Sequence, residues 1–320
     1  MLVTLAACAA LSFVPPQIPG TPTAPLDAVR ALQREDGSWT SVEGAHAERL
    51  ETTSVMLLQL LGEGQTAHVG PQHKRVAAAL DWVRGTQQKD GSFSIDGVPA
   101  TPTVQALASL ALCEAHFLSG ESDVHATRAA GFLVRTLHPE GGWRTSTAED
   151  AVLDTRTSAW GALALASAAD GQLIELGDEL KRIANALTRH NARPVLCTKR
   201  ALAHELVARF VSGDVPEEGD FLRRVELTLA APNPWSTSGK GVEPELRYLQ
   251  SFIAYQTGGE TWKQWQAMLR TQRELVADEE AAGAFVHDPR LTPGGRLAAF
   301  GWNLLTLGVE YRYARVVGER

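Results

Sequence analysis

The chain has 320 residues, of which 44% are hydrophobic and 21% are charged, and its formal net charge at pH 7 is −7. This composition is that of a globular protein, because disordered chains carry fewer apolar residues and more unbalanced charge. The acidic balance excludes the basic surface with which a nucleic-acid-binding protein neutralises phosphates. A chain of this length buries about three quarters of its surface on folding, so its core needs no disulfides or metals.

The N-terminus resembles an export signal. Residues 1–14 are apolar apart from Thr4 and Ser12, a run too short to span a bilayer but long enough for a signal-peptide core. The positively charged n-region of a signal peptide is missing, since no basic residue precedes Arg30. The segment ending at Cys8 resembles a bacterial lipobox. We expect residues 1–24 to be a signal-like or disordered N-terminus of an exported protein that is periplasmic, secreted or lipid-anchored. The alternative is an uncleaved apolar N-terminus on a cytoplasmic protein.

A short motif recurs along the chain. Residues 33–39 read Gln-Arg-Glu-Asp-Gly-Ser-Trp, residues 87–93 read Gln-Gln-Lys-Asp-Gly-Ser-Phe, and residues 137–143 keep the acid, the glycine and the aromatic ring. Trp235 and Phe285 continue the spacing, and His190 marks the place of a copy without an aromatic residue. The period predicts six repeat units, three of them clear and three degraded.

Each unit contains two predicted helices of different character. The outer helices carry an apolar stripe on one side, whereas the inner helices are apolar on nearly every side, which is typical of helices surrounded by other helices. In chain order we expect outer helices at 26–33, 75–87, 123–136, 174–189, 219–230 and 261–276, and inner helices at 54–61, 104–113, 158–166, 201–210, 246–255 and 297–307. Cys113 and Cys197 lie in apolar runs and are predicted to be small core residues.

This alternation builds either an open solenoid or a ring. The chain begins with an outer helix and ends with an inner one, so closure of the ring buries both ends. We therefore predict an all-α protein in which residues 25–320 form a single closed (α/α)6 toroid of six inner and six outer helices.

The motif copies at 33–39 and 87–93 resemble the QW repeats of squalene-hopene cyclases, oxidosqualene cyclases and protein prenyltransferase β subunits. Residues 61–70 are similar to a loop of single-toroid bacterial proteins with prenyltransferase repeats. The resemblance implies an α/α toroid and a structural motif, in which the glycine allows a left-handed turn and the aromatic ring fills the gap to the next helix pair. The residues expected to hold the ring together are Gln33, Asp36, Gly37, Trp39, Gln87, Asp90, Gly91, Phe93, Gly141 and Trp143.

The catalytic residues of these families are not all present. Squalene-hopene cyclases protonate an alkene with an Asp-x-Asp-Asp-Thr-Ala motif, and the similar stretch at residues 151–156 has Leu153 at the position of the proton donor. Asp154 matches the last aspartate, and we expect it to cap a helix. Prenyltransferase β subunits bind zinc through a cysteine that Arg247 or a neighbour replaces here, and His287 stands without companion ligands. We expect no metal and no cofactor.

The inner helices of such a ring begin at one mouth, where helix N-termini favour an anionic or polar group. Charged residues near the crowded inner layer must be paired or hydrated, and aromatic residues there can line a cavity. The candidate ligand-binding residues are Arg156, Trp160, Lys199, Arg247, Tyr248 and Trp302. The candidates for a catalytic acid are Asp154, Glu243 and Glu245.

Three functions remain open from the sequence. The first is a binding toroid that receives an isoprenoid, another apolar small molecule or a protein segment, without nucleic acid and without a transmembrane helix. The second is an isoprenoid-processing enzyme, similar to terpene cyclases, with an acid outside the usual motif. The third is an exported polysaccharide lyase or hydrolase, which needs two carboxyl groups across an open cleft.

Overall fold

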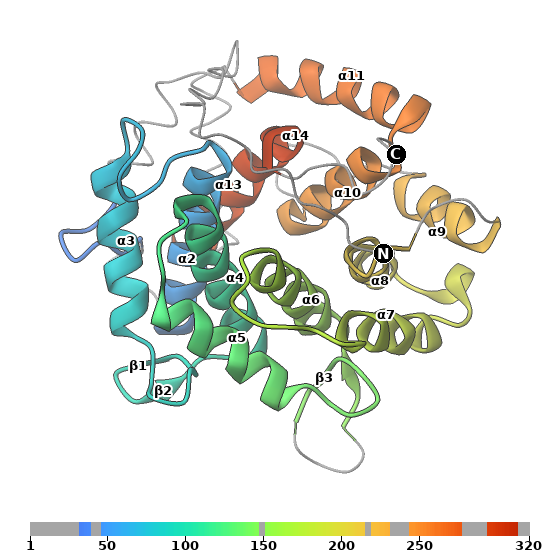
Figure 1. Cartoon of the computed structure of the whole chain (residues 1–320). Helices are drawn as coiled ribbons and strands as arrows, with labels where there is room; N and C mark the ends of the chain where they lie inside the picture. Colours follow the sequence, from blue (N-terminus) through green and yellow to red (C-terminus); the bar gives the residue numbers. More distant parts are fainter. Residues whose placement is uncertain are drawn as a thin grey trace, which may run out of the picture.

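The computed structural model describes residues 32–39, 46–146, 151–214, 219–230, 243–276 and 293–312 (Figure 1). The predicted signal-like N-terminus with Cys8 lies outside the described residues, and so do Trp235, Phe285 and His287. Most of the predicted outer helix at 26–33 also lies outside them, and its last residues, Leu32 and Gln33, form a turn and an isolated β-bridge.

The described residues are mainly helical, and helices of two kinds alternate along the chain. Every predicted inner stretch lies within a helix: α2 (His46–Gly62), α4 (Pro102–Ser119), α6 (Thr155–Asp170), α8 (Lys199–Val211), α10 (Pro244–Thr257) and α13 (Pro293–Leu307). The helices between them are α3 (His73–Gly85), α5 (Val124–Thr136), α7 (Glu179–His190), α9 (Gly219–Leu229) and α11 (Gly259–Val276). A 3-10 turn, η1 (Pro194–Leu196), precedes α8, and the short helix α14 (Val309–Arg312) follows α13.

The inner helices pack against one another in chain order. Helix α2 contacts α4, and the contacts continue from α4 to α6, α8, α10 and α13. The last of these helices, α13, packs against the first, α2 (Figure 1). The other helices lie outside this layer: α3 contacts α2, α5 and α7 each contact two inner helices, α9 contacts α8 and α10, and α11 contacts α10.

Burial follows the two helix types that the sequence predicts. In α4 every residue from Thr103 to Ala115 is buried, because helices surround it on all sides. In α5 only one stripe is buried, formed by Ala126, Ala129, Ala130 and Leu133. The core is therefore concentrated in the inner layer, and the outer helices cover it with one face each.

Two short strand pairs, which the prediction of an all-α protein did not include, connect outer helices to inner ones. Strand β1 (Ser94–Ile95) pairs antiparallel with β2 (Val98–Pro99), and β3 (Trp143–Arg144) pairs antiparallel with β4 (Leu153–Asp154). They form because the chain leaves each motif in an extended conformation and must turn back before the next inner helix begins.

The repeated motif forms the corner between successive helix pairs. Gly37, Gly91 and Gly141 have left-handed φ angles of 91°, 91° and 96°. A Cβ atom at these positions would lie 2.1–2.2 Å from a backbone oxygen of the next outer helix, so only glycine fits. The carbonyls belong to residues 78, 128 and 182, which lie in the N-terminal halves of α3, α5 and α7.

The other motif residues bind neighbouring elements. Gln87 Nε2 donates to the His125 carbonyl at 2.9 Å, as Gln33 Nε2 does to the Arg75 carbonyl at 2.9 Å. Asp90 accepts hydrogen bonds from the backbone and the hydroxyl of Ser92, and Asp36 does the same with Ser38. The aromatic side chains are buried. The backbone N–H groups of these residues donate to side chains of the following inner helix, in the pairs Trp39–Thr53, Phe93–Gln105 and Trp143–Ser158.

The fourth corner, between α7 and α8, is held by polar interactions in place of a glycine and an aromatic ring. Asn191 follows α7, and its side-chain amide donates to the Ala201 carbonyl at 3.0 Å. Arg224 of α9 donates to the Asn191 carbonyl at 3.0 Å and pairs with Glu205 of α8 at 2.9 Å, both side chains being almost fully buried. A buried ion pair and an amide thus link the elements that glycine and an aromatic ring link elsewhere.

The two described cysteines differ in environment. Cys113 is buried in α4, as predicted. The prediction for Cys197 is wrong, because it follows the 3-10 turn η1 and is partly exposed. Pro194 at the start of that turn, together with the Thr198 cap of α8, keeps Cys197 out of the helix.

Candidate functional site

The N-terminal parts of three inner helices meet in one charged cluster. Arg156 of α6 donates from Nε to Glu245 of α10, at 2.8 and 2.9 Å, and from Nη2 to Glu51 of α2 at 2.6 Å. We name these three residues the mouth cluster. The helices α2, α6 and α10 alternate with α4, α8 and α13 in the inner layer. The mouth cluster therefore joins helices that do not follow one another in this layer. Between 17% and 31% of each side chain is exposed, so solvent reaches the cluster.

The contacts of Glu245 favour its ionised form. Burial by itself would raise the pKa of Glu245, but the Arg156 guanidinium and the Trp160 indole N–H hold that pKa below the ordinary value of 4.5. Arg156 stays charged in return, because its two carboxylate partners outweigh burial and raise its pKa. A proton donor needs the opposite environment, one that keeps the carboxyl group neutral.

An aromatic cluster lies directly beneath the mouth cluster. Trp160 of α6, Tyr248 of α10 and Trp302 of α13 have ring centroids 5.0–5.9 Å apart, and at most 4% of any of them is exposed. Trp160 Nε1 donates to Glu245 Oε1 at 2.8 Å, which ties this aromatic cluster to the charges above it. Helix α6 is a neighbour of neither α10 nor α13 in the inner layer. The three rings therefore meet across the centre of the inner layer.

His204 of α8 lies in the same region. Its Nδ1 is 3.0 Å from the Thr155 hydroxyl at the start of α6. Its Nε2 is buried and has no hydrogen-bond partner among the described residues. Burial lowers the pKa of His204 to about 4, so the imidazole is neutral at pH 7. The sequence analysis missed His204, although a histidine and a glutamate inside the apolar run 201–210 are a visible signal.

Asp154 caps helix α6, as predicted. It accepts hydrogen bonds from the Thr157 N–H at 3.0 Å and from the Thr157 hydroxyl at 2.7 Å. Thr101 and Thr198 cap α4 and α8 in the same way. Both carboxylate oxygens of Asp154 therefore accept hydrogen bonds within the first turn of α6, which is the arrangement of a helix cap.

The remaining sequence candidates occupy other places. Glu243, just before α10, forms an ion pair with Arg200 of α8. Arg247 is buried, its Nη1 donates to Asn303 of α13 at 2.7 Å, and burial lowers its pKa to about 10. Lys199 is the first residue of α8 and is partly exposed. The structure thus brings together Arg156, Trp160, Glu245, Tyr248 and Trp302, and it adds Glu51 to them.

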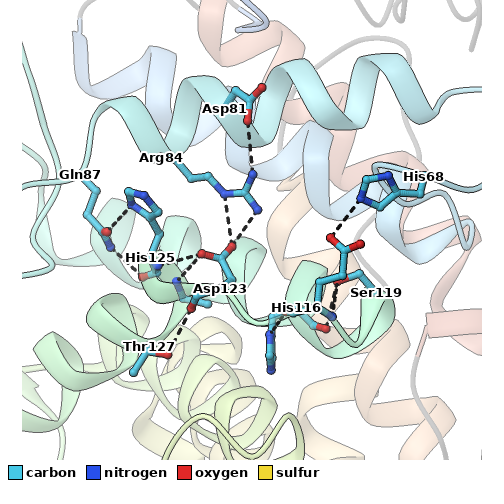
Figure 2. Close-up of polar contacts among 11 residues, drawn as sticks. His68, Asp81, Arg84, Gln87, His116, Ser119, Asp123, His125 and Thr127 are labelled. Carbon is cyan, nitrogen blue, oxygen red and sulfur yellow. Dashed lines mark hydrogen bonds and ion pairs between the residues drawn. The ribbon is translucent and has the colours of Figure 1, made fainter.

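A polar pocket lies where α2 and α4 end. Arg84 of α3 donates to Asp123 (Figure 2), with its Nη2 at 2.9 Å. His68 Nε2 lies 3.1 Å from a carboxylate oxygen of Glu121. The loop at 61–70 contributes Leu61, Thr66 and Ala67 to the lining, beside His116. The volume of about 40 Å³ holds one or two water molecules and no larger ligand.

In the described part of the chain, the His, Cys, Asp and Glu side chains form no group of three or more that could hold a metal ion. None of the helices in these segments is both long and apolar enough to cross a bilayer.

Comparison with known proteins identifies the fold. No protein-family model matches the chain, and no curated protein matches it. Two similar solved structures are of the type II terpene cyclase MstE from Scytonema, an aspartate-to-asparagine variant with its substrate geranylgeranyl dihydroxybenzoate and an aspartate-to-alanine variant with its product merosterolic acid A.

Both comparisons have a TM-score of 0.57 at 13% identity, and they cover 91% of this chain and 97% and 96% of MstE. The chain therefore has the α/α fold of terpenoid cyclases. At this identity the likeness concerns the fold alone.

Proposed function

We propose that residues 25–320 form a single closed (α/α)6 toroid that binds an isoprenoid or a similar apolar molecule at the mouth of its inner layer, without protonating it. Closure is supported by the packing of α13 against α2 and by the alternation of inner and outer helices. The predicted helix at 26–33 would supply the sixth outer helix. The similarity to MstE, whose substrate carries a geranylgeranyl group, supports the ligand class.

The observation that carries the proposal is the aromatic cluster of Trp160, Tyr248 and Trp302 beneath the mouth cluster. Aromatic rings offer a large apolar surface with little conformational entropy to lose, and branched hydrocarbon chains pack well on them. The rings come from three helices and meet at the centre of the inner layer. The hydrogen bond from Trp160 Nε1 to Glu245 connects these rings to the partly exposed mouth cluster.

Binding is favoured over acid catalysis because each candidate acid is already engaged with another group of the chain. Asp154 accepts two hydrogen bonds at a helix cap, Glu243 pairs with Arg200, and Glu245 pairs with Arg156. An isoprenoid cyclase needs an acid that can donate its proton to the substrate. A glycosidase needs two free carboxyl groups across a cleft, whereas Glu51 and Glu245 share one guanidinium group.

Titration with geranylgeraniol tests the proposal. We expect saturable binding, detected by quenching of tryptophan fluorescence and by native mass spectrometry. Substitution Tyr248→Leu removes one ring of the aromatic cluster and should weaken binding by about fivefold, because one aromatic contact contributes about 1 kcal/mol beyond area burial.

The matched control is Trp262→Leu, which removes a buried ring from the outer helix α11 and should leave the affinity unchanged. Circular dichroism establishes that both variants fold. Failure of geranylgeraniol to bind, or equal weakening by both substitutions, contradicts the proposal.

A further inference from the structure

The N-termini of three inner helices are already occupied by side chains of the chain itself. Helix N-termini bind phosphate groups through free N–H donors. Here Thr101 caps α4, Asp154 caps α6 and Thr198 caps α8. The cap of α6 is itself an anion, so the site where a diphosphate would be held already carries negative charge.

The charges at the mouth are also unfavourable for an anionic ligand. Arg156 binds two carboxylates at once, those of Glu51 and Glu245, and Arg200 pairs with Glu243. A diphosphate would have to displace a carboxylate from Arg156 and would then lie beside that displaced charge. Like charges this close repel strongly in a partly buried site.

His204 supplies a hydrogen-bonding atom that is unused in the described structure. The Thr155 hydroxyl contacts Nδ1, whereas Nε2 is buried without a partner. Buried polar atoms are nearly always hydrogen-bonded, so an exception needs an explanation. The hydroxyl of Thr155 either donates to Nδ1 or accepts from it, and Nε2 is correspondingly a donor or an acceptor.

The groups around His204 determine which partner suits it. Glu245, Arg156, Arg200 and Asp154 all act on it electrostatically, so an uncharged partner avoids both repulsion and the loss of an existing ion pair. A hydroxyl group can donate or accept, and it therefore matches Nε2 in either tautomer. A carbonyl group matches the tautomer in which Nε2 carries the proton.

We infer that the mouth selects an isoprenoid with a neutral hydroxyl or carbonyl head group, which hydrogen-bonds to His204 Nε2, and rejects a prenyl diphosphate. This inference rests on the proposed function and names the substrate class of that site. The apolar chain lies on the aromatic cluster, and the head group replaces the missing partner of the imidazole.

Three ligands with the same C20 chain test the inference: geranylgeraniol, geranylgeranyl diphosphate and the corresponding hydrocarbon without a head group. The wild type should bind the alcohol about tenfold more tightly than the hydrocarbon, as one hydrogen bond to a buried group allows. It should also bind the alcohol more tightly than the diphosphate, by tenfold or more.

Substitutions at His204 separate the contribution of the hydrogen bond to ligand affinity from the contribution of side-chain packing. His204→Phe keeps a ring of similar size but lacks both nitrogens, and it should reduce the preference for the alcohol over the hydrocarbon to about one. His204→Gln keeps a side-chain hydrogen-bonding group and should retain part of the preference. Glu51→Gln removes one carboxylate from the mouth and should reduce the discrimination between alcohol and diphosphate.

The outcomes distinguish the two proposals. If the diphosphate binds as tightly as the alcohol, or if His204→Phe keeps the wild-type preference, the inference about the head group is wrong while isoprenoid binding stands. If none of the three ligands binds to the wild-type protein, the proposed function itself fails.

Discussion

Buried polar side chains of the inner helices carry out specific tasks that the apolar pattern of their sequences conceals. Thr53, Gln105 and Ser158 each accept the backbone N–H of a corner aromatic residue. They are buried and hydrogen-bonded, as polar groups in a core must be. His204 is a different case, because one nitrogen is bonded and the other lacks a described partner.

The imidazole of His204 is expected to make stability depend on pH. Its ordinary pKa of 6.5 applies in the unfolded chain, whereas burial lowers the pKa to about 4 in the folded protein. The folded state therefore excludes a proton that the unfolded state binds, and stability is lost as pH falls through this range. The loss by about pH 4 should approach about 3 kcal/mol.

Urea denaturation between about pH 7 and pH 4 measures this dependence. The variant His204→Gln should have a flatter profile than the wild type, because it cannot take up the proton. The control variant His190→Gln changes an exposed residue at the end of α7 and should keep the wild-type profile. A profile that His204→Gln leaves unchanged would show that burial of His204 does not govern it.

At the scale of elements, the corners determine how one helix pair is placed on the next. Each corner glycine touches a backbone carbonyl of the following outer helix, and each corner aromatic N–H binds the following inner helix. The close approach explains why three motif copies share glycine although their other residues vary. The role of the ten motif residues in holding the ring together remains a prediction, which their contacts support.

Two glycines of the same connection separate the effect of the backbone angle from that of close packing. Gly91 and Gly97 have left-handed φ angles of 91° and 79°, but a Cβ at Gly91 would lie 2.2 Å from the Arg128 carbonyl oxygen, whereas one at Gly97 meets nothing within 4 Å. Gly97→Ala should cost about 1–2 kcal/mol from backbone strain alone.

Gly91→Ala should cost at least about 2 kcal/mol more, because α5 must move away from the corner. Thermal and urea denaturation of both variants measure the difference. Equal destabilisation by the two substitutions would mean that the corner tolerates a side chain, and the structural role of the motif would be refuted.

At the scale of the whole molecule, the contact between α13 and α2 decides whether the inner layer is a ring. Gly301 of α13 faces this contact, and a Cβ there would lie 2.6 Å from Val55 Cγ1 of α2. In an open solenoid each repeat is stabilised by its neighbours alone. In a ring, a change at this contact destabilises helices on the far side as well.

Gly301→Ala should therefore destabilise the whole protein by about 1–3 kcal/mol. If the inner layer is closed, hydrogen exchange should be faster in α6, which contacts neither α2 nor α13 in the chain-order packing, as well as in α2 and α13. Gly85→Ala, at the end of α3 where a Cβ meets nothing within 4 Å, serves as the control and should be neutral or stabilising. Faster exchange confined to α2 and α13 would favour the open arrangement.

The sequence by itself determined the order and type of the helices in the described part of the chain. Apolar periodicity is a local property, so it distinguishes inner from outer helices without knowledge of their partners. The corners could be recognised in the sequence for the same reason, since a glycine two residues before an aromatic residue is a local signal. Both the strand pairs and the position of Cys197 were missed, because they depend on how the chain returns to the next helix.

The tertiary structure alone decided which residues share the mouth. Arg156 lies 105 residues from Glu51 and 89 from Glu245, and no local pattern pairs charges across such separations. The protonation states also follow from this assembly: Arg156 keeps Glu245 ionised, and burial keeps His204 neutral. Sequence reasoning named candidate acids, but the electrostatic environment of a side chain exists only after the helices have packed.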